Sequence, residues 1–397
     1  MKDEFKDTEI GKIPVDWEVK EIGELVTFQR GHDLPVNSRK NGIYPVVASN
    51  GIVGYHNEYK VENEGLTIGR SGNLGEPFYV STSFWPLNTT LYVKKFHNSH
   101  PKFMYYFLKT LDLKKYNSGS AVPSLNRNYI HPIKVAVPPL HEQQKIAQIL
   151  SSLDDKIENN NQQNKILEET ANSIFKEWFV NFNFLDENGL SYFENNGEME
   201  FNEDLGSEIP KGWKVGSIYE ISEVIYGAPF SSKLFNECGD GYPLIRIRDL
   251  KTLNPSFFTT EQHAKGTLIY PGNIVAGMDA EFRPYFWLGN IGYLNQRVCT
   301  FKPKYEWIHN YFIYETIKEP LNFFEKSKVG TTVIHLGKSD IDTFKIIVPD
   351  EVTLKNFYIT IDPIFDKIIE NSKQNRYLSN LRDLLLPKLM SGEIRLK

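Results

Sequence analysis

A long helical pattern occurs twice in this chain, and the repeat constrains the fold more than any other feature. Apolar residues recur at alternating spacings of four and three, which is the seam pattern of a coiled coil. Adding 211 (357 − 146) to each position of the first series gives the second, and only Ala171 against Arg382 breaks the agreement in character. The first series is Ile146, Leu150, Leu153, Ile157, Asn160, Asn164, Leu167, Ala171, Ile174 and Trp178, and the second is Phe357, Ile361, Ile364, Ile368, Asn371, Asn375, Leu378, Arg382, Leu385 and Leu389.

Two asparagines recur at matching places in the two series. A polar asparagine on such a seam lowers stability but fixes the register and the partner of the helices. We therefore expect the two helices to pair with each other and to hold two similar domains apart. The alternative is that they are two ordinary amphipathic helices packed on a core.

The regions outside the two helices repeat as well. The segment 13–17 has the pattern Ile-Pro-x-x-Trp and returns at 209–213, an offset of 196 (209 − 13). The segment 119–138 corresponds to 330–349 at an offset of 211 (330 − 119), so the second copy is longer by about fifteen residues (211 − 196). A period near 200 residues indicates a duplicated domain rather than a solenoid of short repeats.

Inside the repeated regions, short strands rich in Val, Ile, Tyr and Phe are bounded by turns, and each region holds one helix-like stretch, at 102–111 and 307–317. These patterns predict two α+β domains. The predicted boundaries are 1–140 for the first globular domain, 141–184 for the first spacer helix, 185–206 for an acidic linker, 207–350 for the second globular domain and 351–397 for the second spacer helix.

Composition limits the class of protein. With 397 residues, of which 40% are hydrophobic, the chain can bury two or three cores. No apolar run approaches the ~20 residues of a membrane span, and the first residues lack the apolar stretch of a secretory signal. Cys238 and Cys299 have no spacing that suggests a disulfide framework or a zinc site. We therefore expect a cytoplasmic protein.

Charge is unevenly distributed along the chain. Residues 11–140 hold 15 Lys and Arg against 10 Asp and Glu, residues 207–350 hold 16 against 16, and residues 141–206 hold 4 against 14. A polyanion would therefore meet the globular domains, while the acidic part would face away from it.

Polar loops are the candidate ligand-binding segments of both globular domains, and the loop of the first domain is rich in glycine. In the first domain they lie at 69–75; in the second they lie at 246–249, where two arginines are expected on one face of a strand end, and at 279–285. Glycine lets backbone approach a ligand, and Arg, Ser and Asn can read base edges or contact phosphates. The alternative for each residue is a solvated turn. The candidate DNA-binding residues are Arg70, Ser71, Asn73, Arg246, Arg248 and Arg283.

Motifs around the first helix carry a family resemblance. Residues 119–125 read GSAVPSL, residues 135–140 read VAVPPL, and residues 141–146 read HEQQKI before a long polar helix. Together with the doubled Ile-Pro-x-x-Trp opening, these motifs resemble the specificity subunit of type I restriction-modification systems along essentially the whole chain. The second copy departs from the pattern, because residues 349–354 read PDEVTL and lack the Glu-Gln-Gln.

The resemblance implies a function. It implies two target recognition domains that each read one half of a split site in double-stranded DNA, separated by an antiparallel coiled coil. That coiled coil would also seat two methyltransferase subunits, which an endonuclease subunit that translocates DNA can join. The resemblance also implies a subunit without catalytic activity or a cofactor of its own.

The motifs of an enzyme are incomplete in the sequence. Six residues separate Gly330 from Gly337, where a phosphate-binding loop needs four. The segment 254–257 reads NPSF, which lacks the second proline of an amino-group methyltransferase motif. Asp279 and Glu281 would need a lysine partner in a nuclease metal site, and Arg283 stands there instead. We expect no catalytic residue, metal site or cofactor.

Aromatic residues near the end of the first helix lie on more than one side of it. Such residues need a second neighbour, which can be a partner protein or the adjacent globular domain. The resemblance favours the methyltransferase, and we expect Phe175, Trp178 and Phe179 to dock it. The alternative function is a coiled-coil structural protein that docks partners through two protein-binding modules.

Overall fold

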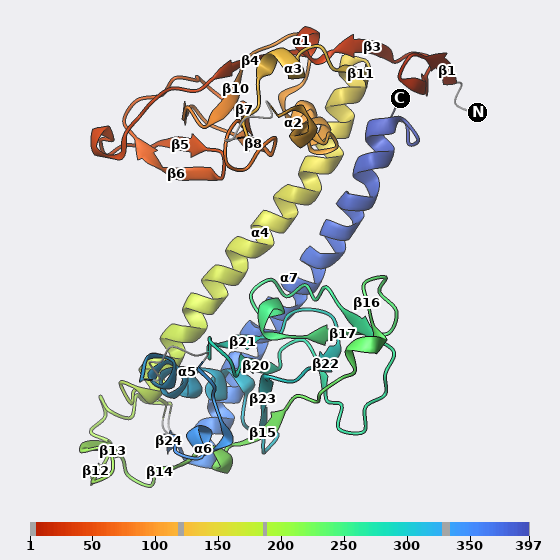
Figure 1. The fold of residues 1–397 in the computed structure, drawn as a ribbon. Helices are drawn as coiled ribbons and strands as arrows, with labels where there is room; N and C mark the ends of the chain where they lie inside the picture. Colours follow the sequence, from red (N-terminus) through yellow and green to blue (C-terminus); the bar gives the residue numbers. More distant parts are fainter. Residues whose placement is uncertain (1–4, 118–122, 186–188, 328–333, 397) are drawn as a thin grey trace. The chain divides into compact units, whose positions relative to one another are not determined.

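The computed structural model describes residues 5–117, 123–185, 189–327 and 334–396. The chain forms two compact units. The first comprises residues 1–157 and 377–397, and the second comprises residues 158–376. Each unit contains one globular domain and part of each of two long helices (Figure 1). The prediction of two mixed α/β domains and two long helices is confirmed.

The first globular domain is built on a four-stranded sheet in the order β4-β10-β7-β8. A three-stranded sheet, β6-β5-β9, and two strand pairs, β1-β2 and β3-β11, complete it. The strands are β1 (Phe5–Thr8), β2 (Gly11–Pro14), β3 (Glu18–Glu21), β4 (Val26–Arg30), β5 (Tyr44–Ala48), β6 (Gly51–His56), β7 (Gly65–Gly69), β8 (Pro77–Val80), β9 (Trp85–Pro86), β10 (Thr90–Phe96) and β11 (Lys134–Val137), and the short helices are α1 (Ile22–Leu25), α2 (Pro101–Lys109) and α3 (Arg127–Ile130).

The second globular domain repeats this plan. Its four-stranded sheet has the order β15-β23-β20-β21, and its strand pairs are β12-β13 and β14-β24, while a five-stranded sheet, β16-β18-β17-β22-β19, replaces the three-stranded one. The strands are β12 (Met199–Asn202), β13 (Ser207–Pro210), β14 (Lys214–Ser217), β15 (Ser222–Tyr226), β16 (Phe235–Asn236), β17 (Tyr242–Ile245), β18 (Phe258–Thr259), β19 (Leu268–Ile269), β20 (Ile274–Gly277), β21 (Pro284–Phe286), β22 (Gly292–Leu294), β23 (Val298–Pro303) and β24 (Lys345–Val348), and the helices are α5 (Asn310–Ser327) and α6 (Lys338–Ile341).

The two long helices are α4 (Leu140–Phe179) and α7 (Glu351–Ser391). Asp350 caps the N-terminus of α7, because its carboxylate accepts a hydrogen bond from the backbone N–H of Thr353 at 2.9 Å. Gly392 follows α7 with φ 76°, a conformation that glycine adopts without strain and that commonly ends helices. The helices begin within one residue of the predicted spacer segments, and α4 ends at Phe179.

Both long helices contribute to the core of each unit. In the first unit Ile146 and Leu150 of α4 and Leu389 of α7 are buried among the strands of the first domain. In the second unit Ala171 of α4 and Phe357 of α7 are buried with residues of the second domain. This burial accounts for the apolar seam, because tertiary packing rather than intrinsic propensity stabilises most protein helices.

The predicted seam faces inward along its length. Each seam residue is buried or half-buried, whereas Ile166 and Tyr377, at matched positions (377 − 166 = 211), are exposed. Within the described residues, none of the helices combines the length and the apolar character that a bilayer crossing requires.

Candidate nucleic-acid interface

The candidate loops of the two globular domains occupy equivalent places. The loop at 69–75 follows β7, and the loop at 279–285 follows β20. These strands hold the third place in their matching four-stranded sheets. Each strand ends in a glycine at which the loop folds back closely. A Cβ on Gly69 would lie 1.7 Å from the carbonyl oxygen of Asn73, and a Cβ on Gly277 would lie 2.5 Å from that of Glu281. Glycine is therefore required at both positions.

A second backbone segment holds each loop at the same point. Ser71 forms an isolated β-bridge with Ser124, and Asp279 forms one with His335. The offset is 208 (279 − 71) for the loops and 211 (335 − 124) for the bridging segments. The bridges therefore pair matching positions, and they place Ser71 and Asp279 at the same point in the two domains.

Four cationic side chains line a groove of about 940 Å³ beside the loop of the first domain. They are Arg30, Arg70, Lys94 and Arg127. Arg70 and Arg127 donate hydrogen bonds to backbone carbonyl groups, at 3.4 Å and 3.3 Å. None of the four has an ion pair to a carboxylate within the part of the chain that the structure describes. The groove therefore presents positive charge that a phosphate backbone could neutralise.

Two features of this groove come from the local structure. Lys94 lies at a β-bulge between Val93 and Lys95 of β10, and a bulge re-aims a side chain relative to a regular strand. His32 also lines the groove, and partial burial lowers its pKa, with the charge of Lys60 acting in the same direction. His32 is therefore neutral at neutral pH and can serve as a hydrogen-bond acceptor as well as a donor.

Cations around the loop of the second domain are held in ion pairs. Arg283 lies 3.5 Å from Glu281 and 3.6 Å from Glu325, and Lys251 lies 2.9 Å from Glu281. The hydrogen bond from Lys251 is the main influence that keeps the pKa of Glu281 below its usual range. The two domains therefore present different electrostatic surfaces at equivalent places.

Arg246 and Arg248 do not share one face of a strand end, so that expectation is wrong. Strand β17 ends at Ile245, and Ile247–Asp249 forms a 3₁₀ turn, in which the alternation of a strand no longer applies. Arg246 donates hydrogen bonds to Asp249 at 2.9 Å and 3.2 Å, and its guanidinium stacks on Phe257 at 4.4 Å. The guanidinium of Arg246 is therefore engaged by contacts within its own domain, whereas Arg248 is exposed.

Of the predicted DNA-binding residues, Arg70, Ser71 and Asn73 lie in one loop, whereas Arg246 is paired with Asp249 and Arg283 with Glu281 and Glu325. Arg30, Lys94 and Arg127 also line the groove, although no motif of the sequence marks them for DNA contact. A signal for Arg30 existed, because Gly31 and Gly227 match at the offset of 196 (227 − 31) and mark equivalent turns after β4 and β15. A glycine is needed at both turns, since a Cβ on Gly31 would lie 2.1 Å from a backbone oxygen and one on Gly227 would lie 2.0 Å from another.

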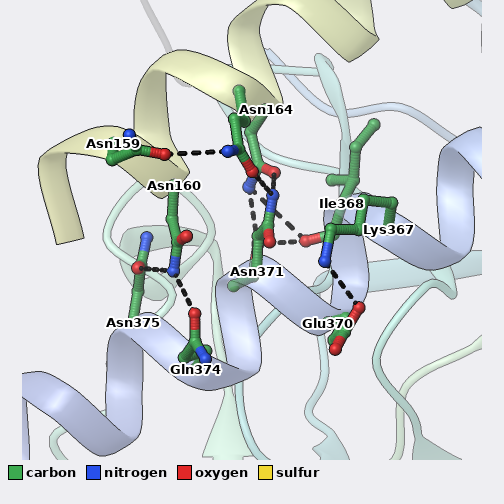
Figure 2. Close-up of polar contacts among 11 residues, drawn as sticks. Asn159, Asn160, Asn164, Lys367, Ile368, Glu370, Asn371, Gln374 and Asn375 are labelled. Carbon is green, nitrogen blue, oxygen red and sulfur yellow. Dashed lines mark hydrogen bonds and ion pairs between the residues drawn. The ribbon is translucent and has the colours of Figure 1, made fainter. Parts of the chain in front are cut away.

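The asparagines of the long helices hydrogen-bond to one another (Figure 2). The amide of Asn160 donates to Asn375 at 2.8 Å, and that of Asn371 donates to Asn164 at 2.9 Å. The helices are antiparallel, because higher numbers in α4 face lower numbers in α7. Asn371 is the repeat-related counterpart of Asn160 (371 − 160 = 211), and Asn375 is that of Asn164 (375 − 164 = 211). The two hydrogen-bonded pairs are therefore equivalent under the repeat.

The one mismatch between the helical repeats has a structural reason. In the first unit Arg382 lies 2.6 Å from Asp154, which also accepts a hydrogen bond from the hydroxyl group of Tyr106 at 2.6 Å. The matching positions of the second unit, at the same offset of 211, are Ala171, Phe365 and Ile317, which are buried together in one hydrophobic cluster. A polar triad in one unit thus replaces an apolar one in the other.

The aromatic residues expected to dock a methyltransferase pack within the second unit, against α5 and α7. Phe179 contacts Phe312 and Phe357, with ring centroids 4.8 Å apart in both cases, and Trp178 contacts Phe357 at 5.7 Å. Trp178 and Phe179 are buried, so the neighbour that their position requires is supplied by the chain itself. Phe175 is half-buried and lines a mainly apolar groove of about 810 Å³ with the exposed residues Val180 and Phe323.

Within the described residues, no group of three or more His, Cys, Asp or Glu side chains is arranged to hold a metal ion. The positive groove and the paired loops provide hydrogen-bonding and charged groups. Such an arrangement can bind a polyanion and distinguish among its functional groups.

The chain is similar in sequence and in fold to known proteins. Residues 14–169 and 210–376 match the type I restriction modification DNA specificity domain. The specificity subunit of the type I restriction enzyme MjaIX from Methanocaldococcus jannaschii is 30% identical over 438 residues, which cover 99% of this chain and 97% of that subunit. The specificity subunit of the type I restriction enzyme HindI from Haemophilus influenzae is 25% identical, over 74% of this chain and 77% of that one.

A solved structure shares the fold. The crystal structure of the S subunit of a type I restriction-modification system from M. genitalium aligns with a TM-score of 0.64 and 16% identity, and the alignment covers 94% of this chain and 96% of that chain. The double-domain architecture with long helices is therefore that of a known fold.

Proposed function

The chain belongs to the type I restriction-modification DNA specificity family, and from this premise we propose that it reads a bipartite, asymmetric site in double-stranded DNA. It is a specificity subunit, which recognises DNA and is not itself an enzyme. In this proposal each globular domain reads one half-site, and the chain directs methyltransferase and endonuclease subunits to that site. The complex acts in the cytoplasm, where the DNA is.

One observation carries the proposal of two unlike half-sites. Equivalent loops, held by equivalent β-bridges, present different side chains: Ser71 and Ser124 in the first domain, Asp279 and His335 in the second. Base readout depends on the pattern of donors and acceptors that a side chain offers. Two copies of one scaffold with different groups at one position would therefore select different bases.

The long helices would set the distance between the half-sites. A helix spanning residues 142–178 rises 36 steps, or ~54 Å at ~1.5 Å per residue. Domains at its two ends would meet half-sites centred roughly 10 to 16 base pairs apart, at ~3.4 Å per base pair. The asparagine pairs support this role, because they would fix the register in which the helices pair.

The methyltransferase is proposed to be present in two copies. The chain offers two similar units, and the exposed residues Ile166 and Tyr377 lie at matched positions on the two helices. A partner that binds one helix surface would therefore find a related surface on the other. Of the aromatic residues at the end of α4, Phe175 is the one that a partner could reach, through the groove that it lines.

Selection of DNA by the purified complex tests the proposal. The chain would be co-expressed with its methyltransferase and incubated with a randomised duplex, and the bound DNA would be sequenced. We expect two short, unlike motifs separated by a gap of fixed length and variable sequence. Enrichment of no sequence would favour the alternative, a coiled-coil protein whose globular domains bind other proteins.

A further inference from the structure

We propose that Asp279, held in place by His335, accepts a hydrogen bond from the exocyclic amino group of a cytosine and so determines one base pair of the second half-site. This inference rests on the proposed function, because it requires that the second domain reads DNA. It assigns a base-reading role to a carboxylate, whereas the arginines of the domain are the more obvious candidates.

The position of Asp279 supports this role. Asp279 stands where the first domain has Ser71, at the point where the candidate loop meets its bridging segment. The backbone N–H of Leu336 donates to the carbonyl of Met278 at 2.8 Å, as that of Leu125 donates to the carbonyl of Arg70 at 2.9 Å. The backbone is thus held in the same way at this point in the two domains, and the side chains there differ.

The carboxylate of Asp279 is oriented by its neighbours. Its Oδ1 lies 2.5 Å from Nδ1 of His335, and its Oδ2 lies 3.6 Å from Nε of Arg297. The side chain of Asp279 is 22% exposed, whereas those of His335 and Arg297 are 56% and 60% exposed. A carboxylate has about four lone-pair sites, so each oxygen retains capacity to accept a further hydrogen bond. The Asp279–His335 pair therefore provides an oriented hydrogen-bond acceptor at the edge of the loop.

A carboxylate at a DNA-binding surface is selective for an electrostatic reason. It repels phosphates, so it gains nothing from non-specific contact with the backbone. It does gain from a base that offers an amino group in the major groove, which adenine and cytosine both do. The N6 amino group of adenine lies beside the N7 acceptor, which repels a carboxylate, whereas the N4 amino group of cytosine has no acceptor beside it on the same base, so cytosine is favoured. Serine at the same point of the first domain both donates and accepts, and it discriminates less between bases.

The test compares DNA selection by three complexes, each formed with the methyltransferase. One contains the unaltered chain, one carries Asp279→Ser, which introduces the residue of the first domain, and one carries Ser71→Ala as the matched control. We expect Asp279→Ser to relax one cytosine of the second half-site by roughly 5- to 150-fold and to leave the first half-site unchanged. Ser71→Ala should leave the second half-site unchanged.

His335→Ala provides a fourth complex that tests the positioning role. It should weaken the same cytosine preference to a smaller extent, because the carboxylate is then less well oriented. Thermal unfolding and retention of the first half-site show whether each variant is folded.

The outcomes separate the inference from the proposed function. If the unaltered complex selects no sequence, the proposed function fails. If it selects a bipartite site and Asp279→Ser selects the same site with the same preferences, this inference alone is overturned, and Asp279 serves only to join the loop to its bridging segment. A relaxed position that is not a cytosine in either strand also contradicts the assignment.

Discussion

Arg395 and Glu142 form a buried ion pair that ties the end of the chain to the start of α4. Nε and Nη2 of Arg395 lie 2.9 Å from the two carboxylate oxygens, and the side chains are 4% and 1% exposed. The indole N–H of Trp17 donates to the same carboxylate at 3.0 Å. In the second unit Trp213 donates to Asp350 at 2.9 Å, and Phe184, the repeat-related counterpart of Arg395 (395 − 184 = 211), stacks on Trp213. The tryptophan of each repeated motif is therefore covered by the segment that follows a long helix.

Loss of Arg395 should destabilise the first unit. Arg395→Ala leaves the carboxylate of Glu142 buried without its cation, which typically costs about 3 to 5 kcal/mol. Lys388→Ala is the matched control, because its ion pair with Glu393 lies on the surface and should contribute little. Equilibrium denaturation of the two variants tests this, and equal effects would contradict the account.

Acid should weaken the same contact. Burial alone would raise the pKa of Glu142, but hydrogen bonds from Arg395, from the backbone N–H of Leu396 and from Trp17 outweigh it and lower that pKa. A carboxyl whose pKa is lower in the folded chain stabilises the fold above its unfolded pKa of about 4.5, and this contribution is lost as the pH falls through the folded value. Glu142→Gln should therefore be less stable at neutral pH, with a smaller further loss on acidification below pH 4.5. Unfolding measured across this pH range tests the sign, and parallel profiles would contradict it.

The polar triad of the first unit should behave as one interacting group. Arg382→Ala removes a half-buried charged partner of Asp154 and should cost about 1 to 3 kcal/mol. The double variant with Asp154→Ala should cost less than the sum of the single variants, because each single change already breaks the pair. Strict additivity in a double-mutant cycle would show that the two side chains do not interact.

The two globular domains should differ in the salt dependence that they confer. Arg30 and Lys94 have no ion pair within the described residues, so their contact with phosphate would release counterions. The slope of log K against log salt is negative, and each alanine variant should make it less steep by about 0.9. Arg283 is already paired with Glu281 and Glu325, so Arg283→Ala should change the steepness of that slope less. Binding titrations at several salt concentrations measure both slopes. Equal reductions would contradict the electrostatic difference between the domains.

The repeat made the architecture predictable from sequence. Apolar spacing and the recurring asparagines predicted the paired helices, because a coiled-coil seam leaves a periodic pattern that needs no tertiary information. The matched Ile-Pro-x-x-Trp motifs predicted the duplication, and the structure shows why tryptophan is needed, since Trp17 and Trp213 both hydrogen-bond to a carboxylate near the start of a long helix.

The candidate site was less predictable because it depends on contacts between distant segments. Ser71 meets Ser124, and Asp279 meets His335, across about fifty residues, and no local pattern reports such bridges. The sequence could not show that Arg246 is bound to Asp249, because that contact requires the 3₁₀ turn after β17. The assignment of individual residues to bases stays a prediction.

Insertion of one heptad into each long helix tests the central claim most directly. Insertions after Asn161 and after Ser372 lie at matched positions (372 − 161 = 211) and preserve the seam. Methylated bases would then be mapped in a host that carries the complex with the altered chain. The account predicts two unchanged half-sites separated by a longer gap. Altered half-site sequences with an unchanged gap would contradict it, because the helices would then read bases rather than set the spacing.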